Sequence, residues 1–229
     1  MIRSAYSVQE FQIVGGPPWL NVDRWDIQAT ATGDIGPERS PDGPTRQQLM
    51  VRALLQDRFG LATHTETRDM PVFALILARR DGRLGTTIQP VTTDCTRPAS
   101  ARGTAPPAGQ PQLPPCSTSV GPGFVRTRGQ TLARFATALS TLSNTGSSLN
   151  RIIIDRTGLA GAYNIELHFT PDRIPQFSSG PPPPGFPALD PNGPSIFTAV
   201  QEQLGLKLDA QRGPVEVLVI DKAERPTAD

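Results

Sequence analysis

Apolar and polar positions follow the same order twice along the chain: a helix, an amphipathic strand, a turn containing proline and a strongly apolar strand. The first copy covers residues 45–78 and the second covers residues 195–221. Three residues at the junction of helix and strand coincide when the copies are aligned: Gln56, Gly60 and Leu61 with Gln201, Gly205 and Leu206. Because such an ordered correspondence rarely arises by chance, the pattern predicts an internal duplication.

Each copy is preceded by a stretch in which apolar and polar residues alternate, as they do in a half-buried strand. In the first half this stretch is residues 24–32 (RWDIQATAT), and in the second half it is residues 162–169 (AYNIELHF). Capping patterns place the starts of two helices at Thr45 and Thr131. An apolar run at residues 152–154 predicts a further buried strand.

These elements predict an α+β protein built from two related halves, each a small mixed sheet packed with two helices. The first half is residues 1–80, and because Met1 leads directly into an uncapped helical pattern, we expect this half to be truncated at its N-terminus. Residues 81–123 form a connecting excursion rich in proline and glycine. The second half is residues 124–229, and it contains a proline-rich insertion at residues 171–194.

Composition argues against several classes of partner. The 229 residues carry a formal net charge of +1, and lysine and arginine are scattered, so the basic patch of a nucleic-acid-binding protein is missing. No apolar run approaches the roughly 20 residues that span a bilayer. No export signal is visible after Met1. The sequence therefore predicts neither nucleic-acid binding nor a transmembrane segment in this chain.

Cysteine and histidine are scarce, which restricts the available chemistry. Cys95 and Cys116 are the only cysteines. They would be free thiols in a cytosolic protein and a disulfide in an exported one. His64 and His168 occupy polar positions of predicted strands, which favours solvent exposure over a metal-binding or general-base role. The sequence predicts no metal site, no cofactor and no catalytic residue.

Five residues are candidates for ligand binding. Asp155 and Arg156 lie in a glycine-containing loop between two predicted strands, and Tyr163 follows that loop. Such a loop could contact a ligand, although a hairpin turn is the favoured interpretation. Trp19, Trp25 and Tyr163 could form a sugar-binding platform, but packing in the core or at its rim is the favoured role.

Four segments carry a resemblance to a known family: AYSVQEFQIVGGPPWLNVDRWDIQA, LLQDRFGLATHTETRDMPVFALILAR, IIIDRTGLAGAYNIELHFTPD and PSIFTAVQEQLGLKLDAQRGPVEVLVIDKAERP. They resemble the soil-associated family of bacterial proteins that carry a domain of unknown function. The resemblance covers nearly the whole chain outside the two proline-rich excursions. It implies export to the periplasm or the extracellular space, and it implies no activity or catalytic residues. At the level of fold, the order of elements also resembles the small N-terminal domains of secretins and TonB receptors.

Three functional hypotheses follow. The first is an exported, non-enzymatic interaction module that binds a protein or cell-envelope partner, for which an exposed sheet edge or an apolar groove would be evidence. The second is a small-molecule enzyme of hydrolase type, which requires Asp155, Arg156 and Tyr163 to meet in one pocket. The third is a sensor ectodomain of a signalling protein. The sequence favours the interaction module.

Overall fold

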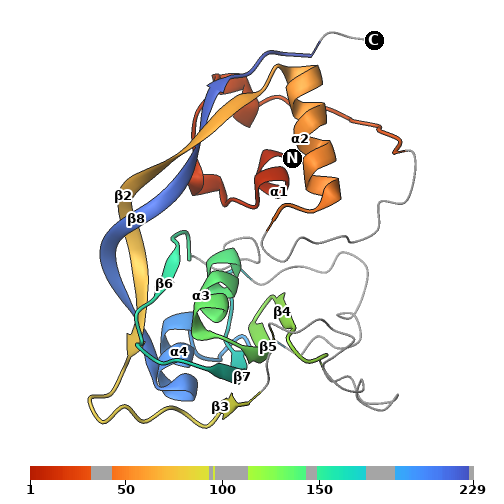
Figure 1. Ribbon diagram of the computed structural model, residues 1–229. Helices are drawn as coiled ribbons and strands as arrows, with labels where there is room; N and C mark the ends of the chain where they lie inside the picture. The colour runs from red at the N-terminus through yellow and green to blue at the C-terminus, as the bar shows by residue number, and fades with distance from the viewer. Residues whose placement is uncertain (32–42, 93–94, 96–112, 143–148, 174–188, 227–229) are drawn as a thin grey trace. The chain divides into compact units, whose positions relative to one another are not determined.

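Figure 1 shows a computed structural model of the chain. It describes residues 1–31, 43–92, 95, 113–142, 149–173 and 189–226. Residues 1–70 and 213–229 form one compact unit, called unit 1, and residues 71–212 form a second, called unit 2. The units do not coincide with the predicted halves of the sequence, because the C-terminal segment belongs to the same unit as the N-terminal segment.

The structure confirms the α+β class, with four α-helices and two sheets among the described residues. The helices are α1 (Ile2–Tyr6), α2 (Arg46–Phe59), α3 (Leu132–Ser140) and α4 (Ile196–Leu204). The strands are β1 (Ile13–Gly15), β2 (Ala62–Leu77), β3 (Ile88–Val91), β4 (Thr118–Gly121), β5 (Phe124–Gln130), β6 (Ile153–Asp155), β7 (Ala162–His168) and β8 (Leu206–Lys222). Two short 3-10 helices, η1 (Glu10–Gln12) and η2 (Pro18–Asn21), flank β1.

Each sheet has four strands. The first has the order β1-β8-β2-β6, and the second has the order β3-β7-β5-β4 with antiparallel pairs. The neighbours β2 and β8, of 16 and 17 residues, each contribute to both units (Figure 1). The expectation of a separate sheet for each half of the sequence is therefore wrong, because strands from both halves form the first sheet.

The ends of α2 and α4 are fixed by the residues that the sequence indicates. The Oγ1 of Thr45 accepts a hydrogen bond from the backbone N–H of Gln48, whose side chain accepts one from the N–H of Thr45 in return. Ser195 caps α4 with its hydroxyl, which accepts a hydrogen bond from the backbone N–H of Thr198. Both helices end at a left-handed glycine, Gly60 with φ of 55° and Gly205 with φ of 68°. The predicted capping box at Thr45 and both predicted glycine stops are confirmed.

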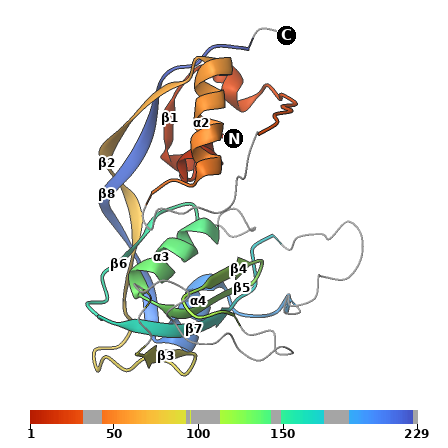
Figure 2. The same ribbon diagram turned by 45° about the vertical axis from the view of Figure 1, so that its right-hand side comes forward.

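In unit 1, the short helix α1 packs against α2 (Figure 2). Gln48 Nε2 donates to the carbonyl oxygen of Ser4 at 3.0 Å, and Arg52 Nε donates to that of Ala5 at 2.9 Å. The guanidinium of Arg52 also lies over the ring of Tyr6, 4.4 Å from its centre. Because these contacts are made by main-chain and ring atoms of α1, they fix the position of the chain start relative to α2.

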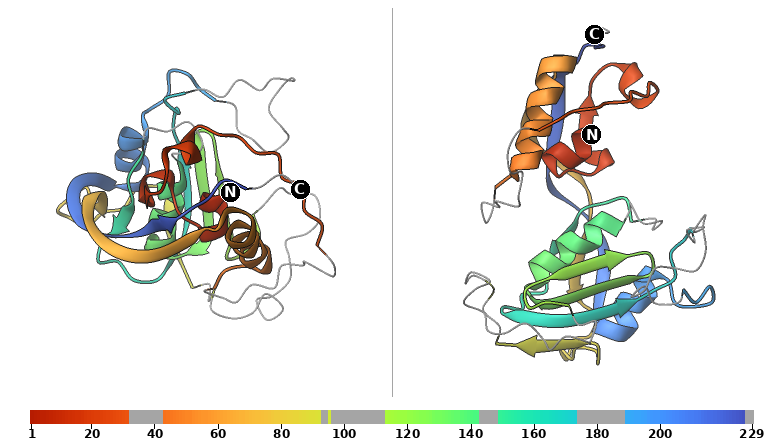
Figure 3. Two further views of the ribbon diagram at one scale, coloured as in Figure 1. Left: turned by 90° about the horizontal axis from the view of Figure 1, so that it is seen from above. Right: turned by 90° about the vertical axis from the view of Figure 1, so that its right-hand side faces the viewer.

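In unit 2, α3 and α4 cover one face of the antiparallel sheet (Figure 3). Alternate residues of β5 and β7 point into the core, among them Val125, Ile165 and Leu167. Phe135 of α3 is completely buried in the same cluster. Several intervening residues, among them Arg126, Asn164 and Glu166, are polar and partly or fully exposed. The alternation predicted for β7 is thus confirmed.

The predicted turns at Pro71 and Pro214 are wrong, because β2 and β8 run through both prolines without interruption. Both prolines are exposed. They lie outside the three-residue segments in which β2 pairs with β6 and β8 pairs with β1. A strand tolerates proline where one of its sides lacks a partner, since no ladder hydrogen bond is lost there.

Three other predictions also need correction. Residues 24–31 form no strand, because alternation alone cannot replace a hydrogen-bonding neighbour. The segment at residues 156–161 is no hairpin, because it links β6 and β7, which belong to different sheets. The excursion at residues 81–123 is partly folded, since it supplies β3 and β4. Residues 96–112 of this excursion, and residues 174–188 of the predicted insertion, lie outside the described residues.

Cys95 and Cys116 form a disulfide, with their Cα atoms 5.4 Å apart. The bond closes a loop between residues separated by 21 positions, and it joins the end of β3 to the start of β4 through short connections. Of the two alternatives that the sequence left open, free thiols and a disulfide, the structure confirms the disulfide.

Reduction of this disulfide is expected to lower the free energy of unfolding by about 3 kcal/mol, because the open loop gains conformational entropy in the unfolded chain. Urea denaturation followed by far-ultraviolet circular dichroism, with and without a reductant, measures the difference. The double variant Cys95→Ser/Cys116→Ser serves as the control and should match the reduced wild type without responding to the reductant. Equal midpoints for the oxidised and reduced wild type would contradict the prediction.

Candidate functional site

A cavity of about 630 Å³ lies within unit 1. Its lining comes from α1, η1, β1, η2 and α2, from residues 23–27, and from the end of β8. Pockets that bind small molecules commonly have volumes between about 300 and 1,000 Å³. The cavity is therefore large enough for a small ligand or for a large side chain of a partner.

Aliphatic side chains form the floor of the cavity. Three of them are buried and belong to one hydrophobic cluster: Leu55 of α2, Leu61 just before β2, and Ile220 of β8. Ile13 and Leu20 pack against this cluster from β1 and η2. The pairing of β1 with β8, in which Ile13 lies opposite Leu218, brings these distant parts of the chain together. An apolar floor of this kind favours the apolar part of a ligand over water.

Three aromatic rings stand around this floor. Trp25 and Phe59 make an edge-to-face contact with their ring centres 6.2 Å apart, and Trp19 lines the cavity from η2. Trp25 keeps 43% of its surface exposed, although tryptophan is usually largely buried. The guanidinium of Arg225 lies 5.9 Å from the ring centre of Trp19. The rings thus provide flat apolar surfaces beside polar groups.

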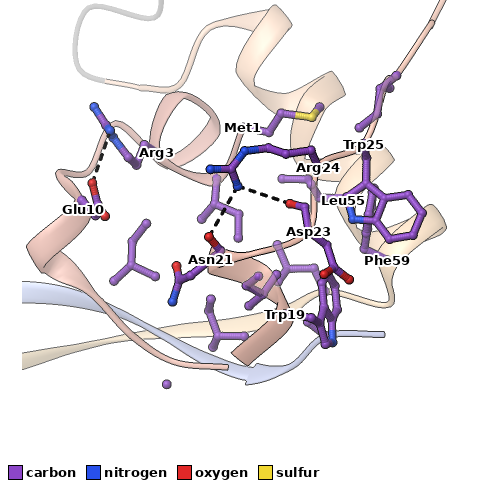
Figure 4. A pocket seen from close by; sticks show the side chains of 18 residues that line it. Met1, Arg3, Glu10, Trp19, Asn21, Asp23, Arg24, Trp25, Leu55 and Phe59 are labelled. Carbon is purple, nitrogen blue, oxygen red and sulfur yellow. Dashed lines mark hydrogen bonds and ion pairs between the residues drawn. The ribbon is translucent and has the colours of Figure 1, made fainter. Parts of the chain in front are cut away.

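Charged side chains lie at the edge of the cavity, and most of them are paired. Arg3 Nη1 lies 3.7 Å from Glu10 Oε2, and Asp23 Oδ2 accepts a hydrogen bond of 2.9 Å from Arg225 Nε. Figure 4 shows Arg24 between the Arg3–Glu10 pair on one side and Trp25 with Phe59 on the other. The site therefore combines an apolar floor, an aromatic wall and a polar edge.

A second cavity, of about 590 Å³, lies on the polar face of the antiparallel sheet in unit 2. Arg126 and Arg128 of β5 line it together with Asn164 and Glu166 of β7. The hydrogen bond from His168 lowers the pKa of Glu166 below its ordinary value, and the positive charge of Arg126 lowers it further. Because these charged groups satisfy one another on an exposed sheet face, the arrangement resembles an ordinary solvated surface.

The structure separates the five predicted binding residues into two groups. Trp19 and Trp25 line the unit 1 cavity together. Asp155 accepts hydrogen bonds from the backbone and hydroxyl of Thr157, and the buried hydroxyl of Tyr163 donates to the carbonyl oxygen of Ala160 at 3.0 Å. Asp155 ends β6, Arg156 begins the link that follows, and Tyr163 lies in β7. None of the three lines either of the two cavities.

Both histidines are partly exposed, as predicted, but each has a carboxylate partner that the sequence did not indicate. His64 Nδ1 lies 2.8 Å from Asp221 Oδ1, and His168 Nε2 lies 2.9 Å from Glu166 Oε1. Within the described part of the chain, no group of three histidine, cysteine or acidic residues could hold a metal ion. No helix in that part is long and apolar enough to cross a membrane.

Several residues of the unit 1 cavity were not predicted, among them Arg24, Phe59 and Ile220. Phe59 and Ile220 carry the pattern of ordinary core residues, and Arg24 lies in a segment predicted to be a strand. The only signal in the sequence is the close spacing of Trp19 and Trp25, the two tryptophans of the chain.

Comparison with known proteins identifies a family without assigning a function. The model of the family described as "Protein of unknown function (DUF3738)" matches residues 1–223, so the chain belongs to this family. The predicted membership of a family with a domain of unknown function is confirmed, whereas soil association and export remain predictions. No curated protein and no solved structure matches the chain, so its similarity to secretin and TonB-receptor domains also remains a prediction.

Proposed function

We propose that this member of the DUF3738 family is an exported, non-enzymatic binding module whose unit 1 cavity receives an apolar group of a protein or cell-envelope partner. One observation carries the proposal: both tryptophans of the chain line a single cavity that has an apolar floor and a polar edge. Exposed aromatic side chains beside buried aliphatic ones are typical of binding sites, because their large rigid surfaces gain most when a ligand covers them.

Export is supported by the disulfide between Cys95 and Cys116, since such bonds persist mainly in oxidising compartments. The binding role also accommodates a sensor ectodomain, which would use the same cavity. The enzyme alternative gains no support from the positions of Asp155, Arg156 and Tyr163, because their polar groups are engaged locally or exposed and share neither cavity.

Internal duplication is supported as a proposal by two features of the topology. The segment from Thr45 through Gly60 into β2 and the segment from Ser195 through Gly205 into β8 share a capped helix, a left-handed glycine and a long strand. The pairing is also reciprocal: β1, from the first half, is parallel to the end of β8, and β6, from the second half, is parallel to the end of β2. A duplicated ancestor whose final strands were exchanged between halves would give this arrangement.

Replacing Trp25 by alanine is expected to weaken the binding of phenylnaphthylamine, a neutral apolar probe, by about tenfold or more, because the variant loses a large part of the aromatic wall that contacts the probe. The increase in probe fluorescence on titration with the full chain measures the dissociation constant. Leu49→Ala is the matched control, since Leu49 is an apolar residue of unit 1 that is 51% exposed and does not line the cavity. Equal affinities for the two variants would contradict the proposal.

A further inference from the structure

We infer that the partner's group that enters the unit 1 cavity is a small amphipathic anion, with its apolar body on the aliphatic floor and one carboxylate-type head group at Arg24. This inference rests on the proposed binding function of the cavity and adds the chemical class of the ligand. It follows from the pairing of the charges at the edge, from the position of Arg24 and from the size of the cavity.

Both carboxylates that line the cavity are already engaged. Glu10 lies next to Arg3, and Asp23 accepts the hydrogen bond from Arg225, which itself lies outside the lining. A cationic ligand would have to displace an arginine from one of these carboxylates. The site is therefore poorly suited to an amine or an ammonium group.

Arg24 has a different set of partners. Its Nη1 donates to the carbonyl oxygens of Asn21 and Asp23, each at 3.4 Å, whereas good N–H···O bonds measure about 2.7–3.2 Å. No carboxylate within 4.0 Å pairs with this guanidinium among the described residues, whose ion pairs at the cavity edge involve Arg3 and Arg225 instead. Its two long bonds leave donors of the planar fork for an anion, and a guanidinium binds a carboxylate through two parallel hydrogen bonds.

The residues around Arg24 indicate the chemical character of the rest of the ligand. Figure 4 shows Arg24 near Met1 and Asn21, with Trp25 and Phe59 to one side. A molecule whose head reaches Arg24 can therefore lay its body against these rings and the floor formed by Leu55 and Ile220. A volume of about 630 Å³ suits a small molecule with an aromatic or acyl body.

Two fluorescent probes of nearly the same shape separate the inference from the proposed function. Anilinonaphthalene sulfonate carries one negative charge, whereas phenylnaphthylamine has the same ring system without it. We expect the full chain to bind the anionic probe about tenfold more tightly than the neutral one, as one charge-assisted contact predicts. Salt should weaken the binding of the anionic probe and leave that of the neutral probe unchanged.

Variants then test whether Arg24 is responsible. Arg24→Gln should remove the preference for the anionic probe while leaving the neutral probe bound, and Arg24→Lys should keep part of it. Arg58→Gln is the matched control, because it removes the same charge from an exposed position of α2 that does not line the cavity. Decanoate should displace the anionic probe at a concentration about tenfold lower than decanol requires.

Each outcome is decisive. A preference that disappears in Arg24→Gln and persists in Arg58→Gln supports the inference. Equal binding of the two probes, or a preference that survives in Arg24→Gln, overturns it while the apolar binding site stands. Failure of both probes to bind overturns the proposed function as well. Thermal unfolding of each variant shows whether the protein is folded. If Arg24→Gln is unfolded, Arg24→Lys decides: a reduced preference for the anionic probe supports the inference, and an unchanged preference overturns it.

Discussion

Replacement of Phe135 by alanine is expected to lower the free energy of unfolding of unit 2 by about 3–5 kcal/mol. Phe135 lies on α3 and is completely buried among side chains of both sheets and α4. The substitution removes a ring from a closely packed core and leaves a cavity that its neighbours cannot fill without moving. Such a loss is comparable with the whole stability of a marginally stable domain.

Urea denaturation followed by far-ultraviolet circular dichroism measures this effect. Phe197→Ala is the control, because Phe197 is an aromatic residue of the same unit that is 39% exposed and makes an edge-to-face contact with the ring of Phe73. We expect it to cost clearly less than Phe135→Ala. Similar costs for the two variants would show that α3 does not form the centre of this core.

Gly205→Ala is expected to destabilise unit 2 by about 2–5 kcal/mol. Gly205 ends α4 with a left-handed backbone, which costs a residue with a Cβ atom about 1–2 kcal/mol. A Cβ at this position would also lie 2.7 Å from the carbonyl oxygen of Arg83 and 3.0 Å from the backbone nitrogen of Gly85. Because main-chain atoms cannot rotate away as a side chain can, overpacking adds a further cost of about 1–3 kcal/mol.

Gly60→Ala provides the comparison for this prediction. Gly60 ends α2 with the same left-handed backbone, but the nearest atom to an added Cβ is the carboxylate of Glu224 at 3.3 Å. This side chain can move, so Gly60→Ala should lower the free energy of unfolding by little more than the cost of the left-handed backbone. Thermal unfolding of the two variants measures the difference, and a larger loss for Gly60→Ala would contradict the steric argument.

Local features of the fold could be predicted from the sequence because they depend on neighbouring residues. Thr45 and Gln48 form the capping box that their spacing indicates, and the glycines that end α2 and α4 are needed for a left-handed backbone. The alternating residues of β7 indicate its buried face. Each of these signals is contained within a few positions of the chain.

Features that depend on distant partners could not be predicted in this way. Pro71 and Pro214 look like turn residues, yet a strand passes through both where its neighbour on one side is short. Residues 24–31 alternate as a strand does, yet no strand pairs with them in the structure. Strand formation requires a partner with free hydrogen-bonding groups, and the sequence of one segment does not show whether that partner exists.

The candidate site was only partly visible for the same reason. Trp19 and Trp25 were identified as candidates from their residue type, but packing was the favoured role. Their role as cavity residues depends on Phe59 of α2 and Ile220 of β8, which line the same cavity from distant parts of the chain. The adjacent charged and glycine residues at Asp155 and Arg156 suggest a ligand-binding loop, but in the structure they mark the end of β6 and the start of its link to the other sheet.

Nuclear magnetic resonance tests directly whether a ligand enters the cavity lined by both tryptophans. The chain has two tryptophans, so the proton–nitrogen correlation spectrum of the labelled protein contains two indole signals, which Trp25→Ala assigns. On titration with phenylnaphthylamine, both signals should shift progressively and give one common dissociation constant. Unchanged indole signals under conditions in which the probe is bound would place its binding elsewhere and contradict the proposed binding site.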